Sequence, residues 1–186
     1  MAEKNNYTSH HDTHHTHSLY DELICHLPYA IFSVASALTV VSFVMQFEPS
    51  DVLTPMVQRR LDVMFHSFHF MHIVFAATGA MLTFMRYSKN IALGIIVGLV
   101  SPAFFCMLSD AILPYFGGLL FGVDMEWHLC FVSEIHNVLP FLIVGIINGI
   151  VMSKHHSSRQ SLYSVFSHFV HILVSSLAST FYIVSH

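Results

Sequence analysis

Charged residues are scarce in this chain. Only 10% of its 186 residues are Asp, Glu, Lys or Arg, whereas soluble domains carry about 25%. Seven Lys and Arg against eleven Asp and Glu give a formal net charge of −4, so the sequence offers no basic surface for the phosphates of a nucleic acid. The shortage of charge also argues against a soluble enzyme.

Cysteine is rare as well. The three cysteines, Cys25, Cys106 and Cys130, form neither a CxxC pair nor a disulfide framework. All three lie in or beside apolar runs, which is typical of ordinary buried thiols. Cysteine spacing therefore gives no functional signal.

Hydrophobic side chains are abundant instead, at 54% of the chain. Five apolar runs each approach the ~20 residues that cross a bilayer, and Tyr or Trp residues mark most of their ends. The runs cover residues 27–47, 63–85, 91–113, 129–152 and 162–184. We predict an all-α integral membrane bundle of five transmembrane helices over residues 25–186. Gly94-xxx-Gly98 and Gly145-xxx-Gly149 predict close packing of the third and fourth helices.

Residues 1–24 are polar and unusually rich in histidine. Five His residues lie close together there: His10, His11, His14, His15 and His17. The segment has no apolar run after a basic start, so it is not a signal peptide. We predict a flexible cytoplasmic tail that chelates metal.

Lysine and arginine suggest the orientation of the bundle. With the N-terminus in the cytoplasm, only Arg59 and Arg60 lie outside. The inside then collects Lys4, Arg86, Lys89, Lys154 and Arg159. The positive-inside rule therefore predicts a cytoplasmic N-terminus and an external C-terminus.

The 16 His residues are the main clue to function, because His is rare within membrane spans. The second span holds His66, His69 and His72. At about 100° per residue, Asp62, His66 and His69 fall within about 60° of one face, and His72 lies about 60° further round. Satisfied core histidines bonded to carbonyls are the alternative interpretation.

Polar residues also mark the other spans. Asp110 precedes Pro114 by four residues, and the fifth span carries His168 and His171 on a stripe with serines. That stripe suits a path or ligand face, or else hydrogen bonds that hold the bundle together. In the fourth span Glu134 and His136 point about 200° apart, so one site could use both only if the helix were distorted near Pro140.

These groups form a ladder of candidate metal ligands: His66, His69, His72, Asp110, Glu134, His136, His168 and His171. No Lys or Arg lies within a span to neutralise the two carboxylates. Ligands spread over different depths suit a translocation route better than a closed structural zinc site. Imidazole and carboxylate suit a divalent transition metal, without choosing among Zn, Fe, Ni, Co, Mn and Cu.

The sequence thus favours a membrane transporter or channel for a metal ion over an enzyme. The second and fifth helices are expected to be neighbours, with His69 and His171 as the foremost ligands. Three alternatives stay open: a membrane-embedded metalloenzyme with a zinc or diiron centre, a cytochrome with haem b between two His residues, and a structural or assembly subunit. The expected partners are the lipid bilayer, the metal ion, and further copies or a larger membrane complex.

Overall fold

A computed structural model describes residues 19–47, 55–154 and 160–185, with side chains from residue 27 in the first segment and from residue 169 in the last. The five His residues of the N-terminal tail and the side chain of His168 lie outside this described part.

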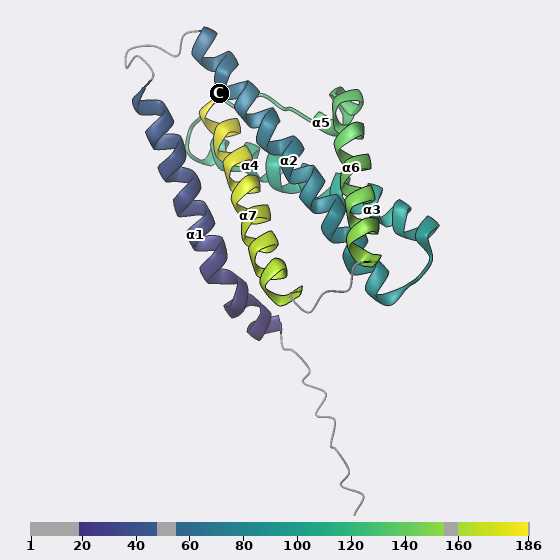
Figure 1. The fold of residues 1–186 in the computed structure, drawn as a ribbon. Coiled ribbons are helices and arrows are strands. Elements are labelled where there is room, and N and C mark those ends of the chain that lie inside the picture. The colour runs from purple at the N-terminus through teal and green to yellow at the C-terminus, as the bar shows by residue number, and fades with distance from the viewer. Residues whose placement is uncertain (1–18, 48–54, 155–159, 186) are drawn as a thin grey trace, which may run out of the picture.

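The described residues form helices and no strand, which confirms the all-α prediction (Figure 1). In chain order the elements are α1 (Leu19–Gln46), α2 (Pro55–Tyr87), α3 (Ile91–Met107), the π-helix η1 (Leu108–Ile112), α4 (Leu113–Leu120), α5 (Cys130–Ser133), α6 (Ile135–Lys154) and α7 (Gln160–Val184).

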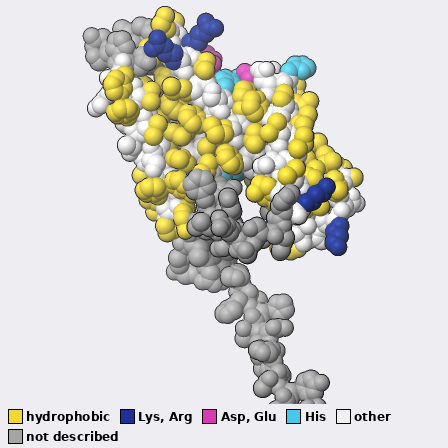
Figure 2. Space-filling view, in the orientation of Figure 1, with side chains coloured by type: hydrophobic (Ala, Val, Ile, Leu, Met, Phe, Trp, Pro, Cys, Tyr) yellow, Lys and Arg dark blue, Asp and Glu magenta, His cyan; other side chains and the backbone are white. Residues whose placement is uncertain are grey.

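The helices have the length and exposure of a multi-pass membrane protein. Four segments are long and apolar enough to cross a bilayer, Leu27–Gln46, Pro55–Tyr87, Ile91–Leu120 and Ile135–Lys154, and α7 contributes the shorter apolar segment Phe169–Val184. Figure 2 shows hydrophobic side chains over the flanks of the bundle, with Lys and Arg near its ends. The start of α1 and the end of α7 lie at opposite ends of the bundle, as five crossings require (Figure 1).

Helix α2 lies at the centre of the bundle. It packs against α3, α6 and α7, whereas α1 packs on α7 at one edge (Figure 1). A Cβ at Gly145 of α6 would lie 2.6 Å from the carbonyl oxygen of Val74, and the Thr78 hydroxyl donates to the Gly145 carbonyl at 3.0 Å. The glycines of α6 therefore allow a close approach to α2, rather than chiefly to the third span as the sequence suggested.

The third crossing is longer than predicted and contains a π-bulge. It runs on through η1 and α4 to Leu120. The amide of Leu113 bonds to the carbonyl of Leu108, five residues back, and Pro114 has no N–H to restore the α-helical pattern. The hydroxyl of Ser179 on α7 donates to the Ser109 carbonyl at 3.2 Å. The bulge carries Asp110 and is fixed against α7.

The fourth predicted span is interrupted at Glu134 and not near Pro140, which lies within α6. Glu134 has φ −126° and ψ 33°, outside the helical region, and it separates the short α5 from α6. The break changes the direction of the chain before α6 begins. His128, Cys130 and Glu134 thereby approach α2, while His136 stays exposed.

Candidate metal centres

The three His residues of α2 divide between two side-chain clusters. The deep cluster consists of His69, His72, Asp110, His171 and Ser175, which come from α2, η1 and α7. The mouth cluster consists of His66, His128, Cys130 and Glu134, which come from α2 and from the segment that precedes α6. The π-bulge forms the first, and the break at Glu134 forms the second.

Asp110 is the centre of the deep cluster and is 0% exposed. Its Oδ2 lies 2.8 Å from Nδ1 of His69 and 2.6 Å from Nδ1 of His72. An ionised carboxylate can only accept hydrogen bonds, so both imidazoles donate through Nδ1–H. In metal sites this carboxylate–His contact holds the ring so that Nε2 faces the ion.

The second carboxylate oxygen is also satisfied. Oδ1 of Asp110 accepts hydrogen bonds from the hydroxyls of Ser109 at 2.7 Å and Ser175 at 2.8 Å. Four donors thus surround a buried acid that lacks a Lys or Arg partner among the described residues. Such dense hydrogen bonding offsets the cost of burying the carboxylate away from water.

His171 meets His72 rather than His69. The two Nε2 atoms lie 3.0 Å apart, with the rings at 81°. Two nitrogens bound to one ion at 2.0–2.1 Å are separated by about 3 Å, so this pair suits a shared metal. Helix packing thus brings His171 level with His72.

The same distance bears on the haem alternative. Axial nitrogens on opposite sides of an iron would be about 4 Å apart at metal–nitrogen bonds of about 2 Å. The 3.0 Å contact between His72 and His171 is closer to the spacing of two ligands on one ion than to that of two axial haem ligands.

His69 has a nitrogen without a partner. The side chain is buried, and its Nε2 has no hydrogen bond within the described part of the chain. The ring stacks on Phe65 at 5.5 Å and meets the edge of Phe131. Because Nδ1 donates to Asp110, Nε2 carries a lone pair, and an unsatisfied buried acceptor costs about 1–3 kcal/mol. This atom is therefore an available metal ligand.

The mouth cluster is organised around His66. Its Nδ1 donates to the Asp62 carbonyl at 2.8 Å, which leaves Nε2 as the atom with the lone pair. That Nε2 lies 3.3 Å from Nε2 of His128 and 3.1 Å from Oε1 of Glu134. The carboxylate oxygen is also 3.8 Å from the His128 nitrogen. With its lone pair on Nε2, neutral His66 cannot donate to Glu134 as His69 and His72 donate to Asp110, so this close contact suits a proton or a metal ion shared between the two groups.

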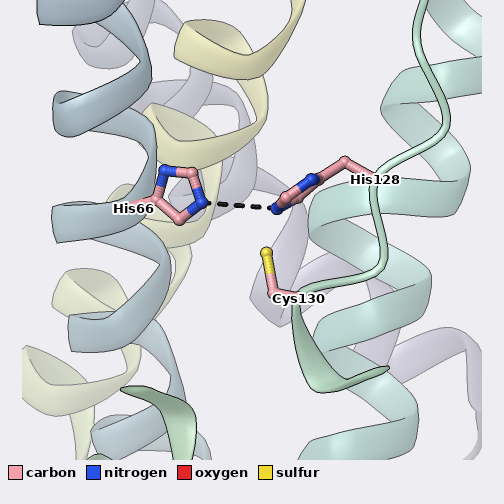
Figure 3. Close-up of side chains that lie close together, drawn as sticks. All are labelled: His66, His128 and Cys130. Carbon is pink, nitrogen blue, oxygen red and sulfur yellow. Dashed lines mark hydrogen bonds between the residues drawn. The ribbon is translucent and has the colours of Figure 1, made fainter. Parts of the chain in front are cut away.

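Cys130 completes the mouth cluster. Figure 3 shows its thiol pointing toward the gap between His66 and His128, and the ligand atoms of the three residues lie within 4.8 Å of one another. Burial lowers the pKa of His128, and the neighbouring His66 lowers it further. Both effects favour the neutral imidazole, which is the form that binds metals.

Sequence reasoning did not identify His128 and Cys130 as candidate ligands. His128 lies just before the predicted fourth span, and Cys130 resembled an ordinary buried thiol. The spacing of His128, Cys130 and Glu134 at the start of an apolar run was the available signal. Among the predicted ligands, His136 is exposed on α6 and forms no hydrogen bond or ion pair with a described residue.

A shallow cleft opens beside the mouth cluster. It has a volume of about 350 Å³ and is lined by Pro55, Gln58, Arg59, Asp62, Glu126 and Ser185. Asp62 connects the two features, because it lines the cleft and its carbonyl accepts from His66. Figure 2 shows acidic and His side chains at this end of the bundle. The mouth cluster therefore lies next to a polar cleft.

Comparison with protein-family models, with curated proteins and with solved structures finds no match for this chain. The role of the two clusters is therefore inferred from their own geometry.

Proposed function

We propose that this membrane protein carries a divalent transition-metal ion across the bilayer along α2. One observation carries the proposal: His66, His69 and His72 occupy successive turns of one central helix, and each has its Nδ1 held by an oxygen acceptor. A rise of about 1.5 Å per residue separates successive imidazoles by about 4.5 Å along the helix axis. An ion could therefore pass between them by ligand exchange.

The surroundings of these imidazoles suit such a path. The acceptors on Nδ1 direct each Nε2 away from the Asp62 carbonyl or the Asp110 carboxylate. Glu134 supplies negative charge in the mouth cluster and Asp110 supplies it in the deep cluster. These charges lower the free-energy cost of placing a cation in a medium of low dielectric. Conduction also needs binding that is weak enough for release, and the two clusters on one helix give the ion a second site to move to.

The positive-inside rule predicts which end of the path faces the cytoplasm. Arg86, Lys89 and Lys154 lie at one end of the bundle, and Arg59 and Arg60 lie at the other, beside the mouth cluster. We expect the mouth cluster to face outward, with a cytoplasmic N-terminus. Reporter fusions at residue 1 and residue 186 should report opposite sides, with the first inside. Two ends on the same side would contradict five crossings.

The transport proposal is tested by reconstitution. Purified full-length protein in liposomes that contain a zinc-sensitive dye should admit Zn²⁺ faster than protein-free liposomes. Excess Co²⁺ or Ni²⁺ should compete, whereas Mg²⁺ should not, because nitrogen-rich sites disfavour hard cations. H136Q is the matched control and should transport like the wild type, since His136 is exposed and outside both clusters. Zn²⁺ entry no faster than in protein-free liposomes would refute the proposal.

A further inference from the structure

We propose that the mouth cluster is a zinc-class metal site with four ligands, in which Cys130 supplies a thiolate beside His66, His128 and Glu134. The inference deepens the proposed transport function and rests on it only for the identity of the cargo. The binding site itself follows from the positions of four donor atoms.

Three of these atoms already surround a space of the right size. Nε2 of His66, Nε2 of His128 and Oε1 of Glu134 are separated by 3.3, 3.1 and 3.8 Å. The nearest point equidistant from all three lies in their plane, about 2.0 Å from each, close to metal–nitrogen bonds of 2.0–2.1 Å and metal–oxygen bonds of 2.0–2.2 Å. One ion can therefore bind all three groups with little rearrangement.

The fourth ligand comes from α5. The thiol of Cys130 points toward the same space (Figure 3), and its sulfur lies within 4.8 Å of the nearest donor atoms of both His residues. A metal–sulfur bond needs about 2.3 Å, so the thiol must move toward the ion, and the ion must leave the plane of the other three donors, to complete a tetrahedral set. Neutral His66 and His128 with anionic Cys130 and Glu134 would balance the two charges of the ion, which favours a site at the membrane boundary.

The thiolate gives this site a selectivity that the deep cluster lacks. Sulfur ligands favour Zn²⁺, Co²⁺ and Cu⁺, whereas Mg²⁺, Ca²⁺ and Mn²⁺ prefer oxygen. The deep cluster presents imidazole nitrogens together with carboxylate and hydroxyl oxygens. Ions would therefore be selected at the mouth cluster, next to the cleft lined by Asp62 and Glu126, before they reach Asp110.

Cobalt spectroscopy tests the site directly. Co²⁺ bound by a thiolate gives a sulfur-to-metal charge-transfer band in the near ultraviolet and strong visible bands when the geometry is tetrahedral. We expect both when Co²⁺ is added to full-length protein in detergent. The variant C25S/C106S keeps Cys130 as its single cysteine and should retain the bands. The His-rich tail cannot produce the charge-transfer band in that variant, because it contains no cysteine.

Adding C130S to this background should remove the charge-transfer band and weaken Co²⁺ binding about tenfold or more. A second measurement needs no change at Cys130: Zn²⁺ should protect the single thiol of C25S/C106S from alkylation, and H66Q should abolish that protection. A band that survives C130S, or alkylation that Zn²⁺ does not slow, would overturn the site. A thiolate band without Zn²⁺ flux would overturn transport alone, and flux without the band would overturn the site alone.

Discussion

Replacing Asp110 with leucine should destabilise the bundle more than any other single change in the deep cluster. D110L leaves the Nδ1–H groups of His69 and His72 and the hydroxyls of Ser109 and Ser175 without their common acceptor. Each buried donor left unsatisfied costs about 1–3 kcal/mol. Hydroxyls can rotate and imidazoles can change tautomer, so we expect a loss of about 3–5 kcal/mol in the free energy of unfolding.

The matched variant D110N separates hydrogen bonding from charge. Its amide oxygen can accept from the two imidazoles, while its NH₂ group donates to the two serine hydroxyls, which can turn to accept. We expect D110N to lose only about 1 kcal/mol of stability while it loses the negative charge that binds a cation. D124L, at an exposed acid, is the control and should change stability by less than about 0.5 kcal/mol.

Thermal or SDS-induced unfolding in micelles measures these differences. If D110L unfolded like the wild type, the carboxylate would not be the shared acceptor of these four donors. If D110N were as unstable as D110L, charge rather than hydrogen bonding would hold the cluster together.

The helices themselves could be predicted from the sequence, because apolar runs near the length of a bilayer must satisfy their own backbone hydrogen bonds. The periodicity of α2 placed Asp62, His66 and His69 on one face; in the structure the Asp62 carbonyl accepts from His66, whereas His69 shares Asp110 with His72. The start of α2 at Pro55 and the extension of the third crossing to Leu120 were not predicted. A hydropathy pattern does not detect these two helix ends, because the first turns of α2 are polar and the Gly117-Gly118 pair resembles a loop.

The composition of the clusters could not be read from local periodicity. The π-bulge inserts one residue into the turn around Asp110 and so changes the direction in which the carboxylate points. The break at Glu134 turns His128 and Cys130 onto α2. The π-bulge is also held by a contact between helices, the hydrogen bond from Ser179 to the Ser109 carbonyl, which no local pattern contains. Which histidine of α2 contacts His171 depends on the axial position of α7 relative to α2, and that position puts it against His72.

The contact between His72 and His171 allows the ligand interpretation to be separated from simple interhelical hydrogen bonding. Glutamine keeps a polar group of similar reach but is a poor metal ligand. If the two residues only join α2 to α7, H72Q and H171Q should be nearly silent, because such a bond is worth about 0.6 kcal/mol in a membrane. If they bind the ion in transit, either variant should lower Zn²⁺ flux by about tenfold or more, while the unfolding temperature stays near that of the wild type.

The double variant H72Q/H171Q gives the strictest test. Two ligands of one ion act as a unit, so the double variant should lose little more flux than either single variant. Independent losses that multiply would mean that the residues do not share an ion. H136Q again serves as the control, since it removes an exposed imidazole from the same bundle without touching either cluster. Wild-type flux in H72Q and H171Q would remove the deep cluster from the path and leave Asp110 as a structural centre.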